Sequence, residues 1–523
     1  MTNGAKALLR TLVDAGVTTC FTNPGTSEMH FVAALDTAPE MRAVLTLFEG
    51  VATGAADGYA RMAGRPAATL LHLGGGLGNG LANLHNARKG KVPIVNIVGD
   101  HATHHVQYDT PLQSDIETVA RNVSSWVRTS ASTAELSRDA VDAIVAASGP
   151  PGQVATLILP ADVSWGEGAK PAAPPVPATP PVASADLVDT VAKALRGGEP
   201  AALLLGGRAL REDVLLAADR IAQATGAKLY AEVFPTRLER GAGLPVVERL
   251  AYLAEFASAQ LAGLKHLVLV DANAPVSFFA YPGKESYLVP DGCQVHELAA
   301  PTDDALTSLD ALVDVLDAAD ITPAVQQLSR PEPPSGELTA DKVCQAIGAL
   351  LPEGAIISDE AQTSGLTLPF HTAGAPRHDL LTLTGGAIGQ GLPVAVGAAV
   401  ACPGRPVFAL QADGSAMYTI QSLWTMAREQ LDVTVVLFNN RSYAILTMEL
   451  QRVGAESVGP KAASQLDLTQ PGLDFVQIGN GMGVPSVRVD DAEQLTAALE
   501  RAVAESGPHL IEVVVPSIFA PQG

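Results

Sequence analysis

The stretch PVFALQADGSAMYTIQSLWTMAREQLDVTVVLFNNRS, residues 406–442, decides the fold. Its first apolar run, 406–410, leads to Asp413-Gly414-Ser415. A helix is expected from about 416 to 429, and a second apolar run, 433–438, leads to Asn439-Asn440-Arg441-Ser442. This pattern predicts a βαβ unit, whose strand ends face the crevice where parallel sheets bind ligands. Asp413 and Asn440 would then share one Mg²⁺, an ion that takes few protein ligands and completes its shell with water and phosphate oxygens.

The same alternation of apolar runs and helical patterns extends outward through the chain. Further strands are expected at 67–73, 94–98, 201–205, 266–270, 355–358 and 510–514. Near-continuous apolar strands separated by helices indicate parallel sheets covered on both faces. Two proline-rich stretches, 166–183 and 329–337, are expected to be stiff linkers. The predicted fold class is therefore α/β, with three consecutive doubly wound parallel-sheet domains at 1–165, 184–328 and 338–523.

Composition narrows the possible partners and the compartment. The 523 residues suit about three domains, and 55 acidic against 33 basic residues give a net charge of −22. This balance disfavours nucleic acid and anionic membranes as partners. The four cysteines show no metal or disulfide spacing, which favours a reducing cytoplasm. Residues 1–17 predict an amphipathic helix rather than a signal peptide, and no apolar run is long enough to span a bilayer.

Three polar residues in the first block are candidates for chemistry. Glu49 lies between an apolar run and a helix of small residues, where desolvation favours its protonated form, although it could equally stabilise the helix start. Thr26 follows Asn23-Pro24-Gly25 at a probable strand end, where a tight turn is the simpler explanation. His72 precedes a glycine run, 74–80, that lacks the dinucleotide frame. It is either a structural histidine or a proton relay near neutral pH.

The Asp-Gly-Ser and Asn-Asn spacing resembles the diphosphate-binding signature of thiamine-diphosphate (ThDP) enzymes, with Ala412 where that signature usually has glycine. Glu49 and the following Ala56-Asp57-Gly58-Tyr59-Ala60-Arg61 also match this family. The resemblance covers nearly the whole chain. It points to the acetolactate synthase and benzoylformate decarboxylase group, most closely to acetolactate-synthase-like large-subunit homologues.

The resemblance implies a role for each matching residue. Glu49 would face the aminopyrimidine and promote its imino tautomer, so that the cofactor forms an ylide that attacks a carbonyl. Ile388 would lie under the thiazolium. The implied metal ligands are Asp413, Asn440 and Ser442, and the implied ThDP-binding residues are Glu49, Asn79, Gln362, Thr363, Gly386, Ile388, Gly414, Ser415 and Tyr443.

The substrate end is expected to combine polar groups with apolar walls. Thr26 and His72 match substrate-contacting residues of the benzoylformate decarboxylase branch, and Phe279 and Ile445 are expected beside them. The second active-site histidine of that branch is not evident, because residues 275–283 are apolar. His101, His104 and His105 are interpreted as a polar loop, because no nearby carboxylate or cysteine has metal-ligand spacing.

Three functions remain open at this point. The favoured one is ThDP- and Mg²⁺-dependent decarboxylation of a small 2-oxo acid, with or without ligation of the enamine intermediate to a second carbonyl. The second is acetolactate synthesis from pyruvate, and the third is a catalytically degenerate homologue with a structural or regulatory role. Bound FAD is not expected. In this group one cofactor lies between two chains, so the resemblance implies a homodimer at least and favours a homotetramer.

Overall fold

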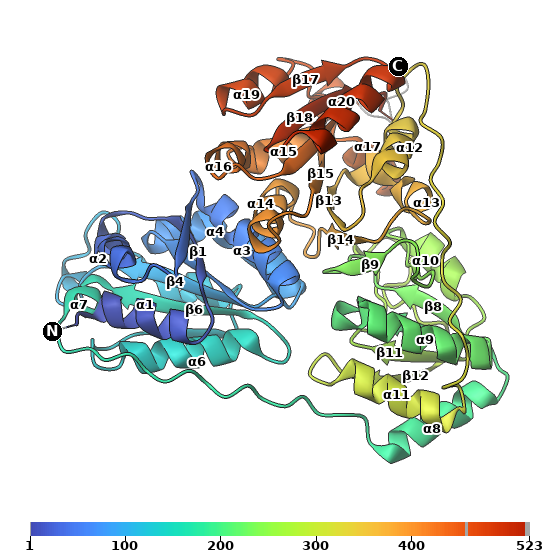
Figure 1. The fold of residues 1–523 in the computed structure, drawn as a ribbon, viewed down its shortest axis with the longest axis horizontal. Helices are drawn as coiled ribbons and strands as arrows, with labels where there is room; N and C mark the ends of the chain where they lie inside the picture. Colours follow the sequence, from blue (N-terminus) through green and yellow to red (C-terminus); the bar gives the residue numbers. More distant parts are fainter. Residues whose placement is uncertain (1, 455–458, 518–523) are drawn as a thin grey trace.

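The computed structural model describes residues 2–454 and 459–517, which form three α/β units, each around its own sheet (Figure 1). The first sheet has the order β2-β1-β3-β4-β6-β5, and all its neighbouring strands are parallel. Its strands are β1 (Thr19–Asn23), β2 (Arg42–Leu45), β3 (Ala67–Leu71), β4 (Ile94–Asp100), β5 (Trp126–Thr129) and β6 (Val154–Pro160). The helices α1 (Gly4–Asp14) and α6 (Leu136–Ser148) pack on one face, and α3 (Glu49–Ala63) and α4 (Leu73–Lys89) pack on the other.

The second sheet, in the middle of the chain, has the order β10-β8-β7-β11-β12. Its strands are β7 (Ala201–Leu205), β8 (Lys228–Ala231), β10 (Glu248–Arg249), β11 (His266–Val270) and β12 (Gln294–Ala299). Its longer helices are α8 (Ala185–Arg196), α9 (Glu212–Thr225), α10 (Ala254–Leu261) and α11 (Ala305–Val315). Chain segments without regular structure lead into and out of this unit, and both are extended in Figure 1. They include the two proline-rich stretches expected as linkers.

The third sheet has the order β17-β18-β16-β15-β13-β14-β9. Its strands are β13 (Ala355–Glu360), β14 (His378–Thr382), β15 (Val407–Ala412), β16 (Val433–Asn439), β17 (Ser486–Val489) and β18 (His509–Val514), with β9 (Leu238–Arg240) at one edge. The helices around it include α12 (Ala340–Leu350), α14 (Gly391–Ala401), α15 (Asp413–Thr419), α16 (Ser422–Arg428), α17 (Ala444–Arg452) and α20 (Ala492–Ala504). The sheet is parallel except for β9, which pairs antiparallel with β14.

Short helices lie in the connections. They are α2 (Met29–Ala34), α5 (Ile116–Arg121), α7 (Ala161–Trp165), α13 (Leu368–His371), α18 (Pro460–Ala463), α19 (Phe475–Gly481), and the 3-10 turns η1 (Thr26–Glu28), η2 (Leu35–Thr37), η3 (Val106–Tyr108), η4 (Gly207–Leu210) and η5 (Gln362–Gly365). No described helix is both long and apolar enough to cross a membrane.

The three-unit α/β architecture predicted from sequence is confirmed, with three local differences. Strand β9 comes from the middle segment and pairs antiparallel with β14, so the third sheet is not purely parallel. The single helix expected at 416–429 is two helices, α15 and α16. The strand expected at 67–73 ends at Leu71, because His72 occupies the position just before α4 and Leu73 already begins that helix.

Helices α3 and α14 join the first and third units. Both are rich in small residues, so their backbones come very close. A side chain at Gly58 would place its Cβ 2.1 Å from the Val394 carbonyl oxygen, and one at Gly397 would lie 1.9 Å from that of Ala55. The buried Asp57–Arg61 pair lies in α3 beside this contact, and Gln390 Nε2 donates to Asp57 Oδ2 over 2.6 Å. This contact fixes how the two units lie in one chain.

Candidate cofactor and substrate site

Three predicted residues meet at one edge of the first sheet. Thr26 lies in η1 after β1, Glu49 begins α3 after β2, and His72 lies after β3, just before α4. These strands are neighbours in the order β2-β1-β3 and run parallel, so their carboxyl ends share one edge. Thr26 is exposed there, whereas His72 is partly buried. The edge therefore gathers a hydroxyl, a carboxylate and an imidazole.

Glu49 is buried, with 7% of its surface exposed. Asn79, one of the predicted cofactor-binding residues, donates from Nδ2 to Glu49 Oε2 over 3.0 Å. Gly76 leaves room for the carboxylate, since a Cβ there would come within 3.0 Å of Oε1. The structure thus brings Glu49 and Asn79 together beside Gly76, where a larger residue would crowd the carboxylate.

Glu28 is the residue that sequence reasoning missed at this edge. Its side chain is 1% exposed, and its Oε2 lies 2.8 Å from His72 Nδ1 and accepts from the Gly25 amide over 2.7 Å. Burial raises the pKa of Glu28, although the hydrogen bonds to Gly25 and His72 act to lower it. The carboxylate fixes the orientation of the imidazole, and the next residue, Leu73, has a left-handed φ of 54°. The sequence does hold a signal for Glu28. It lies three residues after Gly25, the spacing at which a glutamate side chain can accept a hydrogen bond at the start of a helix.

The predicted metal residues lie in two loops, one after β15 and one after β16, that hydrogen-bond to each other. Asp413 begins α15 at the end of β15, and Asn440 follows the neighbouring strand β16. Asp413 Oδ2 accepts from the Arg441 amide over 2.6 Å, and Asn440 Oδ1 accepts from the Ser442 amide over 2.9 Å. Arg441 has a left-handed φ of 58°, which turns this loop tightly. Asp413, Asn440 and Ser442 are therefore brought together.

The electrostatics of Asp413 suit a divalent cation. Burial raises its pKa to about 6, and among the described residues no lysine, arginine or histidine forms an ion pair with it. A buried carboxylate without a cationic partner is stabilised by a metal ion. Asn439, by contrast, donates to the buried Glu512 over 2.7 Å and is structural. No three described His, Cys, Asp or Glu side chains form a metal-binding group, so a cation here would rely on Asp413, amide oxygens, water and phosphate.

At the start of α15, Gly414 packs closely against Tyr443, another of the predicted cofactor-binding residues. A side chain on Gly414 would run into the ring of Tyr443, 2.4 Å away. Ser415 Oγ accepts from Gln411 Nε2 over 2.5 Å. Ala412 stands in place of the usual glycine, but its φ of −79° and ψ of 150° are ordinary for alanine. The residues present therefore fit the predicted cofactor at this end.

Two further loops border the same sheet edge. Gln362 lies in η5 with a φ of 53°, and Thr363 beside it is buried. Gly386 has a φ of 76°, and a Cβ there would meet the ring of Phe278 at 2.5 Å. Ile388 is partly buried in the same loop. Predicted residues from three separate segments thus border one edge of the third sheet.

The middle segment reaches this edge through Phe278, whose ring lies against Gly386. Phe279, the predicted substrate residue, is the neighbour of Phe278; both side chains are partly exposed, and their rings pack edge-on. Ile445 lies in the first turn of α17. One turn later, Glu449 Oε2 accepts from Tyr281 over 2.6 Å, which ties the middle segment to α17.

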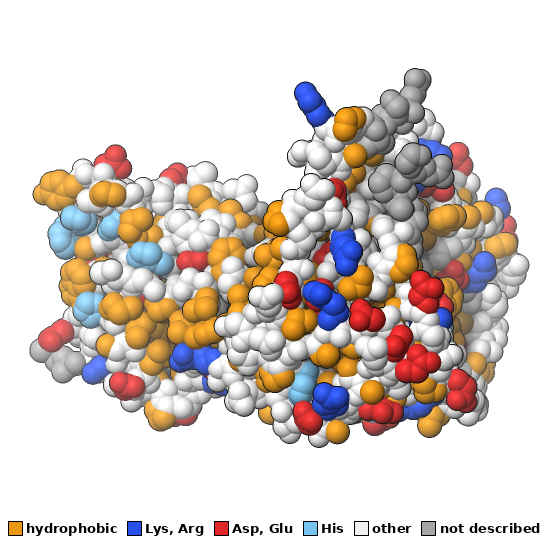
Figure 2. All heavy atoms as spheres, turned by 90° about the horizontal axis from the view of Figure 1, so that it is seen from above, with side chains coloured by type: hydrophobic (Ala, Val, Ile, Leu, Met, Phe, Trp, Pro, Cys, Tyr) orange, Lys and Arg blue, Asp and Glu red, His pale blue; other side chains and the backbone are white. Residues whose placement is uncertain are grey.

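The two groups of predicted residues do not meet within one chain. In the part of the chain that the structure describes, no hydrogen bond or ion pair joins Thr26, Glu49, His72 or Asn79 to the Asp413 loops. Both edges carry exposed apolar side chains: Leu47, Tyr108 and Leu112 near the first, and Met417 and Tyr418 near the second. Figure 2 shows hydrophobic and histidine side chains gathered over the first unit, at left, and acidic ones over the right-hand part.

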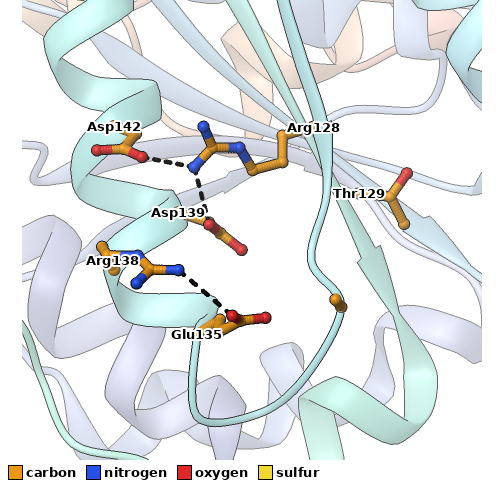
Figure 3. Close-up of a pocket in the computed structure, with 7 residues that line it drawn as sticks. Arg128, Thr129, Glu135, Arg138, Asp139 and Asp142 are labelled. Carbon is orange, nitrogen blue, oxygen red and sulfur yellow. Dashed lines mark hydrogen bonds and ion pairs between the residues drawn. The ribbon is translucent and has the colours of Figure 1, made fainter.

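A cavity of about 370 Å³ lies away from both groups, between β5 and α6 (Figure 3). Its charges are paired with one another. Arg128 contacts Asp139 at 2.9 Å and also Asp142, and Arg138 contacts Glu135 at 3.4 Å. We assign it no role, because these pairs leave no free charge aimed at a ligand.

The fold and site define a class of enzyme that binds a diphosphate cofactor at the carboxyl ends of parallel strands. Comparison with known proteins gives the family. Residues 2–121 match the thiamine pyrophosphate enzyme N-terminal TPP binding domain, and residues 362–513 match the C-terminal TPP binding domain. The chain belongs to the thiamine pyrophosphate enzymes, in the acetolactate synthase and benzoylformate decarboxylase group.

Individual relatives cover the whole chain. A Mycobacterium tuberculosis protein described as "Putative acetolactate synthase large subunit IlvX" is 62% identical over 517 residues, with 99% of each chain covered. Benzoylformate decarboxylase of Pseudomonas aeruginosa is 30% identical, with 96% of this chain and 97% of the relative covered. The structure of a ThDP-dependent 4-hydroxybenzoylformate decarboxylase from Rhodococcus jostii has the same fold. Its TM-score is 0.85 at 24% identity, with 98% of this chain and 99% of that chain covered.

Proposed function

We propose that the protein decarboxylates a small 2-oxo acid with ThDP and Mg²⁺, either releasing an aldehyde or joining the acyl unit to a second carbonyl compound. The observation that carries this proposal is the imidazole of His72, held by the buried Glu28 at the sheet edge that also carries Glu49 and Thr26. Retention of Glu49, Asp413 and Asn440 argues against a purely structural homologue.

Different residues would hold the different parts of the cofactor. Asp413, Asn440 and Ser442 would hold Mg²⁺, while Gly414, Ser415, Tyr443 and the loops at Gln362, Thr363, Gly386 and Ile388 would surround the diphosphate and rings. Glu49, oriented by Asn79, would hydrogen-bond the aminopyrimidine and exchange a proton with it. When bound, ThDP supplies a carbon nucleophile and an electron sink.

The Glu28–His72 pair favours aldehyde release. A decarboxylase must deliver a proton to the carbon that loses carbon dioxide, whereas a ligase joins that carbon to another carbonyl. A histidine whose Nδ1 is fixed by a carboxylate presents its other nitrogen as a donor or acceptor, and such a group suits proton transfer near neutral pH. Thr26 would offer its hydroxyl to the substrate carboxylate from the same edge.

Acetolactate synthesis from pyruvate is the second candidate. It is favoured by the 62% identity to the Mycobacterium tuberculosis protein, whose description names that activity. The two candidates differ in what happens to the acyl unit after loss of carbon dioxide, so product analysis separates them.

We also propose that two copies complete each site. Glu49 and Asp413 would belong to different chains, which accounts for the two separate groups of residues and for the exposed apolar side chains beside each. A dimer is then the smallest active form, and a tetramer of two such dimers is expected. The scattered free cysteines fit our proposal of a reducing, cytoplasmic location.

A screen of 2-oxo acids tests the function. The protein, loaded with ThDP and Mg²⁺, is given pyruvate, longer aliphatic 2-oxo acids and aryl 2-oxo acids, with and without an aldehyde acceptor, and both carbon dioxide and organic products are measured. Aldehyde as the main product supports the decarboxylase. Acetolactate from pyruvate alone supports the second candidate, and no carbon dioxide from any acid contradicts both.

A further inference from the structure

Glu360 is a buried carboxylate among the loops that are predicted to hold the cofactor. It is the last residue of β13 and is 1% exposed. The segment that follows it carries Gln362 and Thr363. The neighbouring strand β15 leads to Asp413 and Ser415, and the loop before α14 carries Gly386 and Ile388. One side chain is thus adjacent to all three segments.

Its two oxygens contact two of those segments directly. Oε1 accepts from the Gly389 amide over 2.6 Å, and Oε2 accepts from the Gly391 amide over 2.6 Å and from Gln411 Nε2 over 3.1 Å. Gln411 Nε2 also donates to Ser415 Oγ. A short chain of contacts therefore runs from the 385–391 loop through Glu360 to the start of α15.

These bonds are specific to a carboxylate at this position. Both amides need an acceptor, and only a carboxylate places one oxygen against each. The fit is tight, because a Cβ on Gly391 would lie 2.8 Å from the Glu360 Cβ. Among the described residues Glu360 forms no ion pair, and burial raises its pKa to about 7 despite the hydrogen bonds. An ionisable group buried without a counter-charge is costly, so a well-packed neutral residue would serve stability better.

We propose that Glu360 is a positioning residue that sets the spacing of the three cofactor-binding segments, and so the affinity for ThDP. This rests on the proposed cofactor roles of those segments. The Gly389 and Gly391 amides flank Gln390, which Asp57 holds from α3, the helix that begins with Glu49. The loop that carries Ile388 is therefore fixed on one side by Glu360 and on the other by the first unit.

The test compares Glu360→Gln with a matched control, Asp379→Asn. Asp379 is equally buried in the same sheet, but it lies near the amino end of β14 and pairs with Arg237 and Arg405. Calorimetric titration with ThDP in saturating Mg²⁺ should show an affinity about 10–100-fold lower for Glu360→Gln, the effect usual for a supporting residue. Asp379→Asn should lower the melting temperature but leave that affinity unchanged.

A second readout needs no cofactor. In the apo protein, hydrogen exchange of the peptide covering 385–392 should be faster in Glu360→Gln and unchanged in Asp379→Asn, because only the first variant replaces one of the two acceptor oxygens and so leaves either the Gly389 or the Gly391 amide without its partner. If Glu360→Gln does not fold, Gln411→Met decides the question, since it removes one donor and keeps the carboxylate. It should weaken ThDP binding and leave the loop amides protected.

The double variant Glu360→Gln/Gln411→Glu keeps the charge and moves it to the neighbouring side chain. It should not restore affinity, and restoration would overturn the proposal. Wild-type affinity with unchanged loop exchange in Glu360→Gln would also overturn it, as would equal losses of affinity in Glu360→Gln and Asp379→Asn. If the wild-type protein itself does not bind ThDP, the proposed function fails, and the exchange measurement still tests whether Glu360 holds the loop.

Discussion

At the residue scale, the proposed function depends most directly on the contact between Glu28 and His72. A carboxylate 2.8 Å from Nδ1 fixes the ring and its tautomer. We expect His72→Ala to lower kcat strongly with a small change in KM, because a group that moves protons in the transition state affects turnover more than binding. Glu28→Gln should lower kcat less and alter the pH profile, since the ring then lacks its charged partner.

Steady-state kinetics across pH, with one 2-oxo acid identified by the screen, measure both variants. Thr26→Val is the matched comparison, because it removes a polar group from the same edge and should raise mainly KM. If His72→Ala raises only KM, then His72 is a binding or packing residue, and the acetolactate synthase alternative gains.

Sequence reasoning found His72 and Glu49 but not Glu28. A histidine after a strand and a glutamate before a helix of small residues are visible in the chain. Glu28, however, has the spacing of a capping residue, and only the tertiary packing of β1 beside β3 brings it to His72. In the same way, Phe279 and Phe278 are equivalent in the sequence, and only the path of the middle segment selects Phe278 as the one that meets Gly386.

At the element scale, the ends of β15 and β16 determine where a metal would bind. Asp413→Ala should abolish Mg²⁺-dependent ThDP binding, because an amide oxygen alone cannot neutralise the diphosphate as a carboxylate and its metal do. Calorimetry with ThDP and Mg²⁺ measures this loss. Asn439→Leu is the control, since Asn439 faces Glu512 instead; it should cost stability and not metal affinity. Wild-type affinity in Asp413→Ala would disprove the metal assignment.

The middle unit is expected to bind no flavin, because of the side chains at the carboxyl ends of β7 and β11. Chain order reverses between these strands, which is the usual place for a nucleotide. Here the Gly207 amide donates to Glu232 over 2.8 Å and the Arg208 amide donates to Asp271 over 2.7 Å. Carboxylates thus occupy donors that a diphosphate would need. The purified protein should be colourless above the aromatic absorption range, and a stoichiometric flavin spectrum would contradict this.

Elements were predictable where the apolar pattern was unambiguous. Strands β7 and β11 have the predicted bounds, because short apolar runs between turn residues leave few alternatives. Strand β9 was not foreseen, since three residues, Leu238–Arg240, carry no periodic signal and pair only after the third sheet has formed. The break between α15 and α16 was also not predictable, because residues 416–429 contain no glycine or proline that would mark it.

At the scale of the whole molecule, the partly buried acid Glu232 couples stability to pH. Burial raises the pKa of Glu232 to about 7 from its ordinary 4.5, with the Gly207 amide and Lys91 opposing the shift and Asp271 adding to it. The folded protein therefore binds this proton more tightly than the unfolded chain. Its contribution favours folding below about pH 4.5 and is lost as pH rises towards 7, by at most about 3 kcal/mol.

Glu232→Gln keeps an acceptor for the Gly207 amide and removes the ionisation. The variant should be more stable than the wild-type protein at pH 8, and this advantage should be much smaller at pH 5, close to the unfolded pKa of 4.5. Thermal unfolding of both proteins at the two pH values measures the difference. An equal effect at both pH values would mean that packing, and not the charge, separates the variant from the wild type.

On the proposed dimer, each site would be completed by two chains, which the separation of the two groups of residues suggests. If Glu49 of one chain serves the cofactor held by Asp413 of another, two inactive variants should complement each other. In a mixed dimer of Glu49→Gln and Asp413→Ala, one of the two sites combines the intact Glu49 of the second chain with the intact Asp413 of the first. The other site carries both lesions.

Random mixing of equal amounts gives half mixed dimers, each with one intact site, so about a quarter of the wild-type activity should return. Each variant is purified with a different affinity tag, so that mixed dimers can be isolated and their share measured. Each variant remixed with itself should stay inactive. If mixed dimers form but remain inactive, Glu49 and Asp413 act within one chain. The edge of the first sheet would then have to reach the third sheet by a movement of its own subunit, against the close contact between α3 and α14.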